Sequence, residues 1–301
     1  MAGPLRSGPA PDLSRKRSRP APLRRSSPFR GCCSQPESTM SHLGNPQQAG
    51  LTLLISATTA VAQIGSFESG TRAFRSGDFE EAVEQFDAYR NEHPSNPWGH
   101  YMCALAEQRS GDLEAAAADY RRAIEIQPAL VKAHRNLARV ELDRGRPDSA
   151  LAPAQQATEI DPESAQSWRV LGRVHHSLGA TEEATLDYER SLEIEPADGW
   201  TLNNLGYLKL QNNDAAGARP LLERAAELLP DEAVVQNNLG VAFERCGDRA
   251  ASAEAYARGA ELGSVKARAS LTRVWIGVDR PRGEQGDDAV LRISQKGVRS
   301  F

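Results

Sequence analysis

The chain has 301 residues and a formal net charge of −4, with 40% hydrophobic and 6% aromatic residues. In residues 1–62, Lys and Arg outnumber Asp and Glu by eight to two, whereas the rest of the chain holds 38 acidic and 28 basic residues. The acidic bulk argues against a nucleic-acid-binding protein, because phosphate neutralisation needs a basic surface.

The amino-terminal part falls into two segments. Residues 1–49 are rich in Pro, Ser, Arg and Gly, a composition that predicts disorder. Residues 50–62 are mostly apolar and end in small residues, as a signal-peptide hydrophobic region and its cleavage site do. Cleavage there would leave Gln63 first, which favours an exported, periplasmic or envelope-associated protein. A short membrane anchor, or an extra helix of a cytoplasmic protein, is the alternative, and Met1 and Met40 both stay open as the start.

From residue 63 to residue 264 the sequence repeats every 34 residues, six times. Prolines keep the interval at Pro94, Pro128, Pro162, Pro196 and Pro230. Turn-forming residues keep it at Gly77, Gly111, Gly145, Gly179, Asn213 and Gly247. Small residues keep it at Gly70, Ala104, Ala138, Gly172, Gly206 and Gly240, and at Ala82, Ala116, Ala150, Ala184, Ala218 and Ser252. With apolar residues at helical spacing between the turn signals, each unit predicts two closely crossing helices joined by a left-handed turn.

This pattern resembles the tetratricopeptide repeat family. The unit with the fullest match has Trp168, Leu171 and Gly172, then Ala184, Tyr188 and Pro196. The resemblance implies an all-α, right-handed solenoid of about six helix-turn-helix repeats. The units are expected at residues 63–96, 97–130, 131–164, 165–198, 199–232 and 233–264.

Three features modify this expectation. Pro153 and Pro220 fall inside second helices, where proline should kink the helix or delay its start. Residues 265–278 carry one apolar stripe and predict a carboxy-terminal capping helix, which a solenoid needs for solubility. Residues 279–301 are expected to be disordered, with a weak strand-like run at 289–293.

No catalytic constellation is found: the sequence has no phosphate-binding glycine loop, paired-histidine zinc motif or nucleophile elbow. The cysteines show no ligand spacing, and Cys103 and Cys246 are expected to be small buried residues. His100 and His134 share a packing position with Trp168. We therefore predict no enzyme activity, no cofactor and no metal site.

The family resemblance implies a concave groove lined by the first helix of each unit. The groove-facing positions it implies are Trp98, Tyr101, Lys132, Arg135, Asn136, Arg139, Arg169, Arg173, His176, Trp200, Asn203, Asn204, Tyr207, Asn237 and Asn238. Arginine forks suit carboxylates, and asparagine offers a donor and an acceptor to an extended backbone.

The resulting prediction is a scaffold or adaptor whose groove binds an extended peptide or partner helix, acidic or carboxylate-ended. Nucleic acid is excluded as a partner, and a membrane contact is expected only through an amino-terminal anchor. Two alternatives stay open: a regulatory subunit of a larger enzyme complex, and a structural protein that assembles with itself. Arginines paired with neighbouring acidic residues as a solvated face would leave no peptide site.

Overall fold

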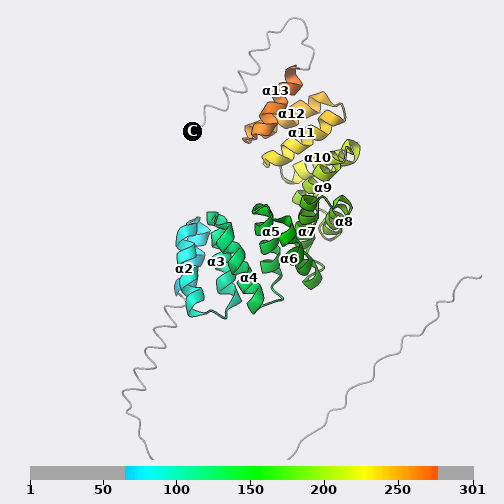
Figure 1. Ribbon diagram of the computed structural model, residues 1–301. Coiled ribbons are helices and arrows are strands. Elements are labelled where there is room, and N and C mark those ends of the chain that lie inside the picture. Colours follow the sequence, from blue (N-terminus) through cyan, green and yellow to red (C-terminus); the bar gives the residue numbers. More distant parts are fainter. Residues whose placement is uncertain (1–64, 277–301) are drawn as a thin grey trace, which may run out of the picture. The chain divides into compact units, whose positions relative to one another are not determined.

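The computed structural model describes residues 65–276, and within them every regular element is an α-helix (Figure 1). A helical run over residues 65–76 comes first. The helices that follow are α2 (Phe79–Glu92), α3 (Pro97–Ser110), α4 (Leu113–Ile126), α5 (Val131–Asp143), α6 (Pro147–Ile160), α7 (Ala165–Leu178), α8 (Thr181–Ile194), α9 (Gly199–Gln211), α10 (Ala215–Leu228), α11 (Ala233–Arg245), α12 (Arg249–Glu261) and α13 (Val265–Ile276).

Helices that follow one another in the chain pack against one another, from α2 through α13. A second set of contacts joins α5 to α7, α7 to α9, α9 to α11 and α11 to α13, so the first helices of successive units also touch. Each hairpin is therefore held by the hairpins before and after it, as repeat architectures require. The predicted all-α solenoid is confirmed.

The turn within each unit depends on a left-handed residue. Gly77, Gly111, Gly145, Gly179 and Gly247 all have a φ between 70° and 97°. In the same position Asn213 has a φ of 60°, and it is the only non-glycine residue with a positive φ between residues 65 and 276. Glycine lacks the Cβ that makes this conformation costly, and asparagine tolerates it better than most residues do.

The small residues in the first helices mark close helix crossings, as predicted. A Cβ built on Gly172 would lie 2.7 Å from the Tyr188 ring, and one on Gly240 would lie 2.5 Å from the Tyr256 ring. Both tyrosines are fully buried. A large residue of the second helix thus fills the space that the small residue of the first helix leaves free, which gives the interior its close packing.

The two internal prolines do not delay the start of their helices. The second helices α4, α6, α8 and α10 begin at residues 113, 147, 181 and 215, which keeps the 34-residue interval. Pro153 lies in α6 and Pro220 in α10, both well inside the helix. The expected delayed start is therefore wrong. Packing against the helices on either side holds these segments helical in spite of the missing N–H group.

The carboxy-terminal helix α13 packs on α12 and α11. It buries Ala267 and Val274 and leaves Lys266 and Arg268 exposed, which is the polar outer face expected of a cap. The segments predicted at 1–49, 50–62 and 279–301 lie outside the described residues. No helix between residues 65 and 276 is long and apolar enough to cross a membrane.

A first-helix surface and a buried polar cluster

The surface formed by α3, α5, α7, α9 and α11, which we call the first-helix face, begins with an aromatic group on α3. Trp98 is 41% exposed and meets the ring of Tyr101 edge-on, with 5.5 Å between the ring centroids. The ammonium group of Lys132 lies 5.9 Å from the centroid of the Trp98 ring. Tyr101 itself is buried, so Trp98 is the member of this group that a partner can reach.

The asparagines of the predicted groove divide into committed and accessible members. Asn136 is buried and donates to the hydroxyl groups of Tyr101 and Tyr120, at 3.2 and 3.4 Å. Asn238 is buried and donates to Asn203 at 2.9 Å. These bonds tie neighbouring units together. Asn204 and Asn237 are only partly buried and keep side-chain groups available.

Four arginines form a patch on α5 and α7, which we call the arginine patch: Arg135, Arg139, Arg169 and Arg173. Each helix contributes two of them one turn apart, and the two helices are in contact. Arg139 is exposed and Arg135 is partly buried. In the part of the chain that the structure describes, neither has a hydrogen-bond or ion-pair partner. Burial lowers the pKa of Arg135, and the charges of Arg139 and Arg169 lower it further.

The arginines on α7 are engaged differently. Arg169 donates to the carboxylate of Asp198 at 2.6 Å, and that carboxylate also accepts the backbone N–H groups of Trp200 and Thr201 at the start of α9. Arg173 lies 3.9 Å from Asp143, with both side chains largely exposed. A surface pair at this distance contributes little to stability, so Arg173 remains open to another carboxylate.

The repeat explains why Arg135 has no such partner. Arg135 and Arg169 occupy equivalent positions, 34 residues apart, and the equivalent of Asp198 is Ser164. Ser164 caps α7 with its hydroxyl group, which accepts the N–H of Ser167 at 3.3 Å. A neutral cap therefore leaves the guanidinium of Arg135 uncompensated, whereas the charged cap neutralises Arg169.

A second exposed aromatic group lies on α9, beyond the arginine patch. Trp200 is 38% exposed and Tyr207 is 42% exposed. The ring of Tyr207 lies 5.8 Å from that of His176 on α7, and His176 Nε2 lies 2.6 Å from Gln211 Oε1. The first-helix face thus places exposed cations on α5 and α7 between accessible aromatic side chains on α3 and α9.

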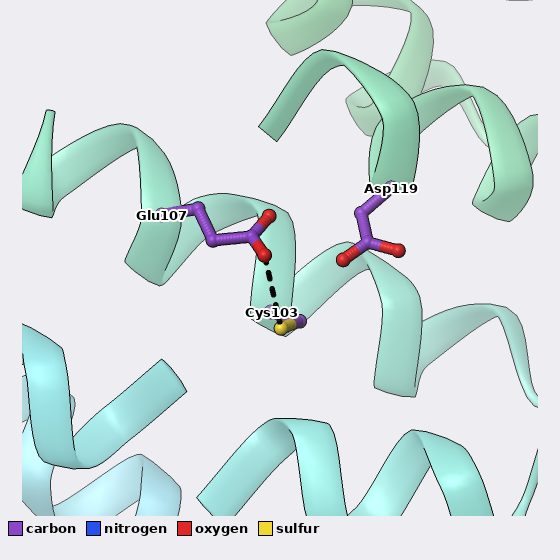
Figure 2. A group of neighbouring side chains, drawn as sticks. All are labelled: Cys103, Glu107 and Asp119. Carbon is purple, nitrogen blue, oxygen red and sulfur yellow. Dashed lines mark hydrogen bonds between the residues drawn. The ribbon is translucent and has the colours of Figure 1, made fainter. Parts of the chain in front are cut away.

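The interior holds a polar cluster that the sequence analysis did not identify. Figure 2 shows Cys103 and Glu107 from α3 facing Asp119 from α4. The Cys103 thiol donates to Glu107 Oε1 at 3.6 Å. All three residues are buried, and their donor atoms lie within 4.8 Å of one another. The spacing of four between Cys103 and Glu107 was the available signal, but Asp119 is brought in only by the packing of α4 on α3.

Charged and polar neighbours surround this cluster. Arg90 from α2 forms an ion pair with Asp119, and His100 Nδ1 lies 3.0 Å from the other oxygen of that carboxylate. Burial raises the pKa of Glu107 above its ordinary value. Burial, assisted by Glu107, raises the pKa of the Cys103 thiol to about 12. The expected burial of Cys103 is confirmed, whereas that of Cys246 is wrong, because Cys246 is exposed.

His134 has the structural role that the repeat position predicts. His134 Nε2 lies 2.8 Å from the carbonyl oxygen of Pro128, and Trp168 donates to that of Pro162 at the same distance. Each side chain thus bonds the ladder proline six residues before it. These bonds satisfy backbone carbonyls at the link between units.

Comparison with known proteins places this architecture in a family. A family model described as Tetratricopeptide repeat matches residues 67–131, 135–199 and 203–267. A search of curated protein sequences finds no match. Among solved structures, pilF of Pseudomonas aeruginosa is similar at 17% identity and a TM-score of 0.61, over 71% of this chain and 98% of that one.

Two further solved structures show the same fold. PilW, described as a widely conserved type IV pilus biogenesis factor, is 17% identical with a TM-score of 0.62, over 70% of this chain and 98% of its own. A protein of Thermus thermophilus, described as a thermophilic TPR protein, is 18% identical with a TM-score of 0.52, over 60% of this chain and 99% of its own. At such identities the likeness concerns the fold.

Proposed function

The chain belongs to the tetratricopeptide repeat family, and from that premise we propose that it is a non-enzymatic scaffold that binds a protein partner along the first-helix face. Fold alone does not name a partner, because repeat scaffolds serve many pathways. The chemistry of the exposed side chains on this face therefore has to define the class of ligand.

The observation that carries the proposal is the unpaired state of Arg135 and Arg139. A partly buried guanidinium without a counter-ion costs free energy in the unbound protein, and a ligand carboxylate recovers it. Arg173, with only a distant partner in Asp143, adds a third cation. The partner segment is therefore acidic, or ends in a carboxylate, where it crosses α5 and α7.

The aromatic side chains on either side suggest the rest of the ligand. Trp98 and Trp200 are both more than one-third exposed, and tryptophan is among the residues that most often dominate binding interfaces. A segment that extends from the arginine patch toward α3 or α9 would gain from apolar residues outside its acidic run. We propose an extended acidic segment with apolar flanks as the ligand.

A binding experiment with the full chain tests this proposal. Fluorescein-labelled peptides of one length carry either an Asp/Glu run or the same run as Asn/Gln. The acidic peptides should bind more tightly, and the double variant R135A/R139A should weaken their binding by about tenfold per arginine, because a hydrogen bond to a charged group is worth roughly 1.5–3 kcal/mol. The slope of log Kd against log salt should also become shallower.

The matched control removes the same charge from another surface. Arg122 and Arg224 are exposed on the second helices α4 and α10, each beside a glutamate one turn away. R122A/R224A should retain the affinity of the unmodified chain. Equal affinity for acidic and amide peptides, or equal losses in the two double variants, would exclude the first-helix face as an acidic-peptide site.

A further inference from the structure

The buried polar cluster contains a carboxylate oxygen that the protein itself leaves unsatisfied. Glu107 is only 6% exposed, and its Oε2 atom is buried without a hydrogen-bond partner. Its other oxygen accepts only the weak thiol donor of Cys103, and the nearest cation, Arg90, lies 3.9 Å from it. Leaving a buried acceptor unpaired is costly, so such an atom requires an explanation.

Equivalent positions in later units do not share this defect. Glu141 stands 34 residues after Glu107 and is fully buried, but Arg144 donates to both of its oxygens at 3.0 and 3.2 Å. In the next unit His175 occupies the position, and its Nδ1 lies 2.6 Å from Asp187. Among the described units, only the one formed by α3 and α4 combines a thiol and two carboxylates with an unsatisfied oxygen at this position.

The donor set has the chemistry of a metal site. Cys103 Sγ, a Glu107 oxygen and an Asp119 oxygen lie within 4.8 Å of one another and come from two packed helices (Figure 2). Zn²⁺ accepts both thiolate and carboxylate ligands, whereas Mg²⁺ and Ca²⁺ are bound by oxygen ligands alone. A thiolate in the set therefore favours zinc.

The surrounding charges balance such an ion. A divalent cation with three anionic ligands leaves one negative charge, and the guanidinium of Arg90 supplies the compensating positive charge beside Asp119. Arg90 also pairs with Asp87 at 2.6 Å, so it can shift toward that partner and keep a counter-ion. His100 contacts Asp119, in the manner of the outer groups that orient metal ligands.

The cluster is also connected to the surface. A cavity of about 460 Å³ is lined by residues that include Arg90, His100, Glu107 and Asp119. An ion therefore has a route to the carboxylates without unfolding of the helix pair, which a plausible metal site requires.

We propose that Cys103, Glu107 and Asp119 bind a zinc ion that joins α3 to α4 and satisfies the unpaired oxygen of Glu107. Binding releases the thiol proton of Cys103 to solvent, because the thiolate is the ligand. The ion has a structural role in the amino-terminal part of the repeat array, independent of the partner that the first-helix face binds.

Cobalt serves as a spectroscopic probe for this site. In a full chain with C32S, C33S and C246S, Cys103 is the only thiol, and titration with Co²⁺ should produce a thiolate-to-cobalt charge-transfer band that added Zn²⁺ removes. Further replacement with C103S should abolish the band. The melting temperature should rise on addition of Zn²⁺ in the first protein and stay unchanged in the second.

Two more variants test the remaining residues. E107Q keeps the size of the side chain and should weaken Co²⁺ binding by at least tenfold, while H100Q should weaken it by about 10-fold to 100-fold, as loss of an orienting group does. Circular dichroism of each metal-free variant establishes that it is folded. A folded protein that has Cys103 as its only thiol and shows no charge-transfer band would overturn the proposal, as would a band that survives C103S.

Discussion

Arg169 on α7 donates to Asp198 at 2.6 Å, and Asp198 caps the amino terminus of α9, so this arginine joins two consecutive first helices. Its equivalent, Arg135, has Ser164 where Arg169 has Asp198. The same residue type at the same repeat position therefore stabilises the fold in one unit and stays available to a partner in the previous one.

The first prediction separates these two roles by stability. R169A leaves the buried carboxylate of Asp198 without its cation, and the free energy of unfolding should fall by about 2 kcal/mol. R135A removes a cation without a partner and should change it by less than about 0.5 kcal/mol. Urea denaturation followed by circular dichroism measures both variants. Similar losses in the two would show that Arg135 is also structural.

The second prediction converts the unpaired arginine into a paired one. S164D places a carboxylate opposite Arg135, as Asp198 stands opposite Arg169, and aspartate caps a helix about as well as serine. The protein should become slightly more stable, and its affinity for acidic peptides should fall without removal of any cation. S149D, at an exposed position in α6, adds the same charge as a control. A full retention of affinity in S164D would mean that Arg135 does not contact the ligand.

The third prediction concerns the turn at Asn213. Its φ of 60° is left-handed, so N213A should destabilise the protein by about 1 kcal/mol, the cost of that conformation for a residue with a Cβ. N213G should be neutral or stabilising, because the other units place glycine there. The neighbouring Asn212 has a φ of −84°, and N212G should lower stability instead. Thermal melting of the three variants checks the order, which would be reversed if the turn residue were held by its side chain.

The fourth prediction is a pH dependence. Burial raises the pKa of Asp187 above its ordinary value of 3.8, although the bond to His175 opposes the shift. The folded state then holds the proton more tightly than the unfolded state, so this group stabilises the fold below pH 3.8 and loses that contribution as pH rises through the raised pKa. The stability of the unmodified chain relative to D187N should therefore decline over that interval. A constant difference between the two proteins would contradict the shift.

The fifth prediction concerns the amino terminus. Amino-terminal sequencing of the protein purified from its native cell should find Gln63 first, since residues 50–62 have the pattern of a signal-peptide hydrophobic region and cleavage site. A mature chain that still begins at Met1 or Met40 would remove the case for cleavage and leave the anchor and the extra helix as the alternatives.

The helices, their turns and their order were predictable because each depends on neighbouring residues. The 34-residue ladders of proline, glycine and alanine repeat the same local instruction, and helix and turn formation are decided within a few residues. The starts of α6 and α10 show where this reasoning falls short: a proline was expected to delay each helix, but packing on both sides keeps it in register.

The candidate site was predictable only as a set of positions. Trp98, Arg139, Trp200 and Tyr207 are exposed as a binding surface requires, whereas Asn136 and Asn238 use their amide groups to bond neighbouring units. No local pattern separates these two fates, because the partners of Asn136 and Asn238 in the preceding units lie 35 residues away.

By itself, the sequence determined that this protein is a helical repeat array with arginines and aromatic residues on the first helices, since periodicity and local propensity act over one or two turns. Only the tertiary structure decided that Asp198 neutralises Arg169 while Arg135 keeps its charge, and that Asp119 meets Cys103 and Glu107. Charge pairing and ligand convergence depend on which side chains the packing of separate helices brings within a few ångströms.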